Sequence, residues 1–258
     1  MPFVMPVTIK SQNEIDIMRS AGGINAEVRE ILRENISPGI TGFELDRLAQ
    51  EAIKARGAIA TFLGYSPWGK PPYPGAICFS VNEVLVHGLP GNQRLEEGDL
   101  VSIDLGVTYQ GYVSDAAFTV GVGMVSEEAR SLMEITEESL VQGISVATVG
   151  NRIGDISQTI GACGEESSLG IIRGYGGHGV GREMHEEPHI PNHGRKGTGL
   201  ELRRGMVVAL EPMFCIGDPA THELEDEWSV AISDGSLSAH FEHTVAITDN
   251  GPEVLTRA

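Results

Sequence analysis

The chain has 258 residues, of which 41% are hydrophobic and 21% charged, and this composition excludes global disorder. Acidic residues outnumber basic ones by 36 to 18, and the resulting net charge of −18 argues against direct nucleic-acid binding. No run of about 18 apolar residues predicts a membrane span. The start MPFVMPVTIK lacks a signal-peptide pattern, and three cysteines without a CxxC motif indicate reduced thiols. We therefore expect a cytoplasmic protein.

Two capping boxes predict where the first helices begin. Ser11-Gln12-Asn13-Glu14 precedes apolar residues at helical spacing, and Thr41-Gly42-Phe43-Glu44 precedes a second such run with Gly57 as its stop. Gly22 and Gly23 weaken the first helical pattern. Further helices are expected at 126–141 and 150–160, and strands at 76–86, 100–108, 111–122, 206–215, 228–232 and 240–248.

The order of two helices followed by strands occurs twice, which indicates an internal duplication. Gly42-x-x-Leu45-x-x-Leu48-x-Gln50 resembles Gly150-x-x-Ile153-x-x-Ile156-x-Gln158. Asp104 and Glu211 end apolar runs at nearly equivalent points of the two halves. No linker separates the halves, so we expect one domain with pseudo-twofold symmetry.

Two aspartates interrupt the apolar strands of residues 101–120, VSIDLGVTYQGYVSDAAFTV. A hairpin turn centred between Tyr109 and Gln110 would place Asp104 directly opposite Asp115, with Cβ atoms about 5 Å apart. Two facing anions inside apolar strands are unfavourable unless a proton or a cation lies between them. The alternative is that both side chains point to solvent.

Two further acids interrupt strands that look buried, Glu211 in VVALEPMF and Glu242 in HFEHTVAIT. Either acid alone could pair with an Arg or a His, but no Lys or Arg lies inside these strands. Four such acids need about four positive charges, which two divalent metal ions would supply. His178, flanked by glycines, is the candidate nitrogen ligand or else a hydrogen-bonded structural histidine. Carboxylates with one imidazole suit Mn²⁺, Fe²⁺, Co²⁺ or Zn²⁺.

The segment His185-Glu186-Glu187-Pro188-His189 matches the HExxH string of zinc proteases. That motif works on a helix, where both histidines share a face. Pro188 would break such a helix, so the zinc-protease interpretation is disfavoured, although His185 can still act alone.

Five blocks of the sequence together resemble the type I methionine aminopeptidases. They are NEVLVHG (82–88), DLVSIDLGVTYQGYVSDAAFT (99–119), GYGGHGVGREMHEEP (174–188), VVALEPM (207–213) and EHTVAITDNG (242–251). The resemblance covers the chain from about Ser11 onward. It implies the pita-bread fold, an α/β fold with two pseudo-symmetric helix-helix-strand halves around a central antiparallel sheet. Residues 1–258 would form one catalytic domain, with halves at 11–122 and 126–248.

The resemblance also implies a centre for two divalent metal ions. Asp104 would be a bidentate ligand of one metal, Asp115 and Glu242 would bridge both, and His178 and Glu211 would complete the other shell. The backbone carbonyls of Asn82, Val84 and Ser238 match positions that can hold a monovalent cation.

The implied reaction is removal of an N-terminal methionine from nascent proteins whose second residue is small. A hydroxide bridging the metals would attack the first peptide bond, with Glu211 as proton shuttle. His87 would contact the substrate near that bond, and His185 would hydrogen-bond the peptide carbonyl and its developing oxyanion. The candidate residues of the methionine pocket are Phe62, Tyr65, Cys78, Met184 and Trp228.

The segment between Tyr65 and Cys78 is about five residues longer than is common in the family, so that Trp68 and Tyr73 both become candidates for the pocket. Met184 stands where an aromatic residue is common. The expected partners are N-terminal Met peptides and nascent chains, with contact to the ribosome as an open question, and the expected state is a monomer. No membrane contact is expected.

Three alternatives remain open at this point. Prolidase or aminopeptidase P activity on X-Pro peptides belongs to the same fold, but those enzymes usually carry a large additional N-terminal domain. A non-catalytic pita-bread binding protein would lack metal ligands, whereas all five are present here. A helical zinc protease is disfavoured by Pro188.

Overall fold

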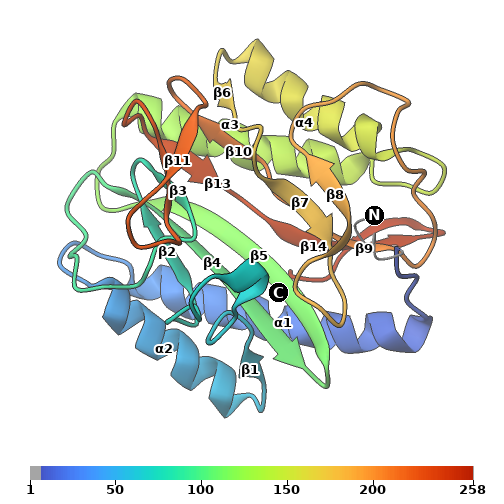
Figure 1. The fold of residues 1–258 in the computed structure, drawn as a ribbon, viewed down its shortest axis with the longest axis horizontal. Coiled ribbons are helices and arrows are strands. Elements are labelled where there is room, and N and C mark those ends of the chain that lie inside the picture. Colours follow the sequence, from blue (N-terminus) through green and yellow to red (C-terminus); the bar gives the residue numbers. More distant parts are fainter. Residues whose placement is uncertain (1–6, 258) are drawn as a thin grey trace.

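Residues 7–257 are described by the computed structural model, and their helices and strands follow an order that occurs twice (Figure 1). The first half contains α1 (Gln12–Asn35), α2 (Gly42–Ala55), β1 (Ile59–Ala60), a 3₁₀ turn (Pro67–Gly69), β2 (Cys78–Val81), β3 (Val84–Val86), β4 (Leu100–Tyr109) and β5 (Tyr112–Gly121). The second half contains α3 (Glu127–Ser145), α4 (Ile153–Glu166), β6 (Gly170–Ile171), β7 (Gly176–Gly179), β8 (Glu186–Pro191), β9 (Val207–Leu210), β10 (Met213–Cys215), β11 (Thr221–Glu223), β12 (Val230–Ile232), β13 (Ser238–His240), β14 (His243–Thr248) and β15 (Gly251–Val254).

Both predicted capping boxes are present at the helix starts. Ser11 caps α1 and Thr41 caps α2, each exchanging hydrogen bonds with the glutamate three residues later. α1 continues without a break through Gly22 and Gly23. A Cβ atom at Gly22 would lie 2.0 Å from the carbonyl oxygen of Leu255, so the missing side chain lets the C-terminal segment approach the helix closely.

The helices enclose the strands from two sides. Figure 1 shows α1 and α2 along one side of the strands and α3 and α4 along the opposite side. Within residues 7–257, no helix combines the length and the apolar character needed to cross a membrane. The helices therefore serve as covers for the sheets.

The strands of the first half pair around β4, which has β1, β2 and β5 as neighbours. In the second half, the sheet order is β15-β14-β9-β7-β8. The two halves join where Glu242 donates its backbone N–H to the carbonyl of Ala117 at 3.0 Å and Ala117 donates back at 3.4 Å. This junction lies next to Asp115 and holds Glu242, so it brings acids of both halves together.

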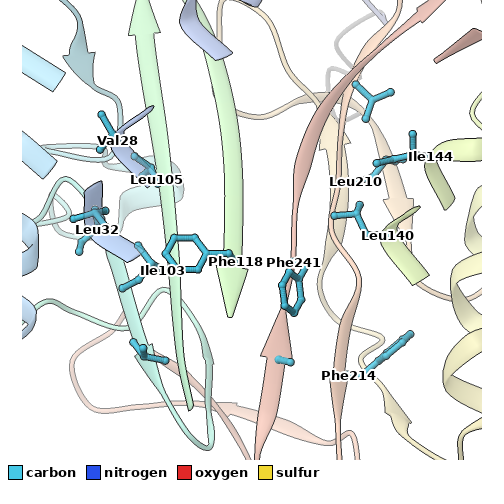
Figure 2. Close-up of a cluster of buried hydrophobic side chains, with 14 of the residues drawn as sticks. Val28, Leu32, Ile103, Leu105, Phe118, Leu140, Ile144, Leu210, Phe214 and Phe241 are labelled. Carbon is cyan, nitrogen blue, oxygen red and sulfur yellow. The ribbon is translucent and has the colours of Figure 1, made fainter. Parts of the chain in front are cut away.

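Figure 2 shows one cluster of buried apolar side chains that extends across the strands from α1 to α3. Val28 and Leu32 of α1 lie on the same side as three strand residues, Ile103, Leu105 and Phe118. Leu140 and Ile144 of α3 lie on the other side, together with Leu210, Phe214 and Phe241. Because successive side chains of a strand point to opposite faces, Asp104 lies on the other face of β4 from Ile103 and Leu105.

The register of the β4–β5 hairpin differs from the predicted one. Tyr109 pairs with Tyr112, and the turn consists of Gln110 and Gly111, both with positive φ (48° and 79°). The predicted pairing of Asp104 directly with Asp115 is therefore wrong, because Asp104 faces Ala117. A shift of two residues keeps every side chain on its face of the sheet, so the two aspartates are diagonal neighbours.

Candidate metal centre

A cavity of about 530 Å³ lies between the two halves of the chain. Asp104 and Asp115 from the β4–β5 hairpin line it, together with His178 of β7 and Glu211, which follows β9. Glu242, 1% exposed, follows β13 and is within ligand distance of the same group. The fold thus brings together all five residues that the resemblance implies as metal ligands.

The histidine and the acids lie within reach of a common ion. His178 Nε2 is 3.2 Å from Glu211 Oε1 and 3.8 Å from Asp115 Oδ2. Ligand atoms of Asp115, His178 and Glu242 all lie within 4.8 Å of one another. Among the described residues, a second group with the same spacing joins Glu211 and Glu242 with His240.

Sequence reasoning missed His240. Its Nε2 atom is 3.6 Å from Glu211 Oε2. The available signal was the spacing of two residues between His240 and Glu242, because residues i and i+2 of an extended segment face the same side. Phe241, between them, points the other way, into the apolar core.

Backbone contacts hold the ligands in position. Nδ1 of His178 lies 2.8 Å from the carbonyl of Gly179, which can only accept, so Nδ1 carries the proton in this contact and Nε2 is directed to the acids. Asn192 donates its side-chain amide to the carbonyl of Glu211 at 2.7 Å. The Thr244 hydroxyl bonds both the N–H and the carbonyl of Asp115. These contacts fix the backbone of Asp115 and Glu211 and the ring of His178 before any ion binds.

The residues at the centre fit divalent metal ions. Within the described part of the chain, several buried ligand atoms have no hydrogen-bond partner: Asp104 Oδ1, Asp115 Oδ1, Glu211 Oε1, Glu242 Oε1 and His240 Nε2. Buried carboxylate oxygens without partners are costly, and a cation among them removes that cost. Oxygen donors with imidazole suit Mn²⁺, Fe²⁺, Co²⁺ or Zn²⁺.

The metal-free acids repel one another. Burial and the neighbouring acids raise the pKa of Asp104 and of Glu242 well above the usual range for carboxyls, and burial raises the pKa of Asp115 to about 7. Glu211 is different, because contacts with His178 and His240 outweigh its burial and lower its pKa. Burial opposes the charged form of His178, yet Glu211 and Asp115 raise its pKa to about 9. In the metal-free protein, bound protons thus neutralise part of the negative charge that a cation would otherwise neutralise.

Three more histidines line the same cavity, His87, His185 and His189. Burial lowers the pKa of His185 to about 3 and that of His87 to about 4, so both are neutral at neutral pH. The His185 ring lies 4.4 Å from the His178 ring, centre to centre. The hydroxyl of Tyr65 is 2.7 Å from Nδ1 of His185. A neutral imidazole beside the carboxylate cluster can donate a hydrogen bond without adding charge.

The rest of the cavity is apolar, and all five predicted pocket residues line it: Phe62, Tyr65, Cys78, Met184 and Trp228. Tyr73 lines it as well, with its ring edge-on to Trp228 at 5.0 Å between ring centres. Of the two further candidates for the pocket, Tyr73 is thus found in its wall. The side chain of Trp68 lies outside the part that the structure describes. Such a mixture of aromatic, thioether and thiol groups suits a flexible apolar guest.

The inserted loop is tied to the segment that carries Trp228. Trp228 donates its ring N–H to the carbonyl of Pro71 at 3.1 Å. Lys70 pairs with Glu223 and lies 5.3 Å from the Trp228 ring centre. These contacts fix one wall of the pocket.

The segment matching HExxH is not helical. Glu186–Pro191 forms β8, which pairs with β7, so His185 and His189 do not share a helical face. The His185 ring contacts that of His178, and His189 lines the same cavity. This geometry excludes the helical zinc-protease arrangement.

The residues implied for a monovalent cation lie close together around β3. Ser238 donates both its N–H and its hydroxyl to the carbonyl of Asn82, each at 3.0 Å. Val84 begins β3, two residues after Asn82. The Asn82 carbonyl thus already accepts two hydrogen bonds.

The C-terminal segment packs behind the centre. Arg29 of α1 donates to the carbonyl of Thr256, and the Thr256 hydroxyl bonds His243 Nδ1 at 2.8 Å and accepts from the N–H of Thr244 at 3.2 Å. Thr244 in turn holds Asp115, as described above. A continuous chain of contacts therefore runs from α1 through Thr256 to a metal-ligand candidate.

Comparison with known proteins agrees with this fold. Residues 16–249 match metallopeptidase family M24, a class of metal-dependent peptidases. The chain is 49% identical to a methionine aminopeptidase of Clostridium perfringens, over 97% of this chain and 98% of that one. The crystal structure of methionine aminopeptidase from Thermotoga maritima superposes with a TM-score of 0.94 at 43% identity, covering 98% of this chain and 100% of the other.

The chain belongs to the methionine aminopeptidases of family M24. Prolidases share the fold at lower similarity. The prolidase of Pyrococcus furiosus has a TM-score of 0.78 and 27% identity, and the match covers 97% of this chain but 65% of the prolidase. The pita-bread fold predicted from the sequence is thereby confirmed.

Proposed function

We propose that the protein removes the N-terminal methionine from peptides whose second residue is small, with a two-metal centre held by Asp104, Asp115, His178, Glu211 and Glu242. The observation that carries this proposal is the set of buried carboxylate oxygens without partners, gathered around His178 at one end of an apolar cavity. His178 and bound protons balance only part of this negative charge, and divalent cations would balance the rest.

The five residues would divide as the resemblance implies. Asp104 would bind one ion, His178 and Glu211 the other, and Asp115 and Glu242 would bridge the two. Divalent ions in such a centre act as Lewis acids and lower the pKa of bound water. The His178 contact with Gly179 supports this role, because it directs Nε2 toward the acids.

The side chains around the centre would handle the proton and the developing charge. Glu211, kept ionised by its histidine neighbours, can accept a proton at a carboxylate oxygen and pass it to the leaving amine. His185, neutral and with Nδ1 bonded to Tyr65, can donate from Nε2 to the peptide carbonyl, where negative charge develops. His87, which lines the same cavity, would contact the substrate near the same bond.

The apolar wall supports methionine as the side chain that enters. Phe62, Tyr73 and Trp228 pack edge to face and leave room beside Met184 and Cys78. A thioether can interact with aromatic rings on several sides, and burying it releases water from apolar surface.

We further propose one domain over residues 1–258, with repeated halves at 11–122 and 126–248, acting as a monomer in the cytoplasm on nascent chains. The free thiols Cys78, Cys163 and Cys215 suit a reducing compartment. A monovalent cation near Asn82, Val84 and Ser238 belongs to the same proposal. The expectation about a signal peptide concerns in part residues 1–6, which lie outside the described residues.

The test is a peptide assay with metal control. The stripped protein is incubated with Met-Ala-Ser and with an X-Pro peptide, with added Mn²⁺ or Co²⁺, and with or without chelator. We expect release of methionine from Met-Ala-Ser only when metal is present. Cleavage of the X-Pro peptide alone would assign prolidase-like activity, and cleavage of neither would indicate a binding protein.

A further inference from the structure

His240 is a buried imidazole next to the centre to which no role has been given above. It is 1% exposed, and its Nε2 atom has no hydrogen-bond partner among the described residues. The carboxylate oxygen Glu211 Oε2 lies 3.6 Å from this nitrogen, beyond hydrogen-bond distance but within ion-pair distance. The same Glu211 presents its other oxygen, Oε1, to His178. Glu211 therefore lies between two imidazoles.

The backbone of His240 is hydrogen-bonded on both sides, so the position of its Cα and Cβ atoms is fixed. β13 pairs with β10, with His240 opposite Met213. On the other side, His240 donates its N–H to Thr119 Oγ1 at 2.9 Å, and the Thr119 hydroxyl donates to the His240 carbonyl at 2.8 Å. A ring attached to such a rigid backbone can orient a neighbouring carboxylate.

We propose that His240 is a positioning residue, whose Nε2–H donates to Glu211 Oε2 and so directs Glu211 Oε1 to the metal site. The inference rests on the proposed two-metal function. A buried carboxylate with one oxygen on a donor has a fixed orientation, whereas a free carboxylate can rotate about its last torsion.

The competing interpretation makes His240 a direct ligand, because its nitrogen shares a possible ion-binding group with Glu211 and Glu242. The two interpretations differ in where the Nε2 proton is. A donor keeps the proton when metal is bound, and a ligand must lose it. Glutamine can replace a donor by its amide group, but it is a poor replacement for an imidazole ligand.

The experiment compares full-length wild type with His240→Gln, His240→Leu and, as a surface control, His222→Leu. Metal binding to the stripped proteins is measured by calorimetry with Mn²⁺ and by the visible absorption of bound Co²⁺. We expect His240→Leu to bind about tenfold or more weakly with an altered Co²⁺ spectrum, and His240→Gln to stay within about threefold of wild type. The kcat values are expected to follow the same order, with His240→Leu the lowest, while KM changes little.

A second measurement reads the proton position in the wild type itself, and His240→Gln serves only to assign the signal. In wild type labelled with ¹⁵N-histidine and loaded with Zn²⁺, the ring signal absent from His240→Gln should report a protonated Nε2. An unprotonated Nε2, or loss of one metal equivalent in both variants, would overturn the proposal in favour of a ligand. Wild-type affinity and spectrum in His240→Leu would overturn it as well. A wild type that binds no Mn²⁺ would contradict the metal centre itself.

Discussion

The hydroxyl of Tyr65 lies 2.7 Å from Nδ1 of His185 and joins the apolar pocket to the catalytic side of the cavity. Burial raises the pKa of Tyr65 and lowers that of His185, so at neutral pH the phenol keeps its proton and the imidazole is neutral. A phenol that donates to Nδ1 leaves the ring proton on Nε2. The pair therefore sets which nitrogen of His185 can donate to a substrate.

Replacing Tyr65 with Phe should consequently lower kcat by about tenfold, because His185 would lose its preferred tautomer while the apolar wall stays in place. The measurement is steady-state hydrolysis of Met-Ala-Ser, with metal content determined in parallel. Tyr109→Phe, in the hairpin turn region, is the matched control. A drop in metal content instead of kcat would show that Tyr65 supports the metal site.

Asp115→Ala should sharply lower metal occupancy, because Asp115 is shared by the aspartate pair and by the His178 group. Elemental analysis after dialysis against metal-free buffer would measure the ions that remain. Asp249→Asn, an exposed surface acid, should keep the wild-type content. Equal metal content in Asp115→Ala and wild type would remove Asp115 from the ligand set.

Glu211→Gln and Glu211→Ala should both reduce turnover by a factor on the order of 10² or more, since neither side chain can carry the proton. Glutamine keeps the volume and one oxygen, so comparing the two separates proton transfer from packing. Rates are best measured with saturating Mn²⁺, which compensates for weaker binding. Turnover in Glu211→Gln close to wild type would assign the proton shuttle to another group.

The stability of the metal-free protein should fall as pH rises from about 7 to about 9, above the range in which the lowered pKa values of His87 and His185 act in the opposite direction. The pKa of Asp115 is raised to about 7 and that of His178 to about 9, so the folded state holds both protons more tightly than the unfolded state. Their contribution is complete below the unfolded pKa values and is lost as pH passes through the folded ones. Glu211, whose pKa is lowered, acts oppositely only at lower pH, near its ordinary pKa.

Thermal unfolding of chelator-treated protein across this pH range tests that expectation. Added Mn²⁺ should raise Tm more at high pH than at low pH, because the ligands must lose protons to bind it. A Tm of the stripped protein that increases over the same range would contradict the assigned proton positions.

Two adjacent glycines of α1 should respond in opposite ways to alanine. A Cβ at Gly22 would collide with the carbonyl of Leu255, whereas none of the surrounding atoms lies within 4 Å of a Cβ at Gly23. We expect Gly22→Ala to destabilise the protein and Gly23→Ala to stabilise it by about 0.5–1 kcal/mol. Urea unfolding of both variants measures the difference. Equal effects would mean that the C-terminal segment can move aside.

The sequence predicts the parts of the fold that local chemistry decides. The helix starts at Ser11 and Thr41 follow from side chains that bond nearby backbone groups, and the structure has them where the pattern indicates. The hairpin register does not follow in the same way, because it depends on the positive φ values of Gln110 and Gly111 rather than on apolar alternation. An error of two residues leaves alternation intact, which is why the acids were still assigned to the correct face.

The site is predictable to the extent that its residues break a pattern. Asp104, Asp115, Glu211 and Glu242 are charged residues within apolar strands, and this conflict is visible in one sequence. His240 breaks no such pattern, because a lone histidine next to a strand is common. Its position beside Glu211 depends on β13 pairing with β10, a long-range contact that no local signal gives.

The contacts of Thr256 make the candidate metal centre depend on residues that are far apart in the sequence. Arg29, near the beginning of the chain, and Thr244, which holds Asp115, both bond Thr256. Contacts between residues so distant along a chain form late, after the loops between them have closed. During synthesis, α1 and the β4–β5 hairpin leave the ribosome long before Thr256 does. We therefore expect hydrolytic competence to emerge only after residue 256 has been added and has docked.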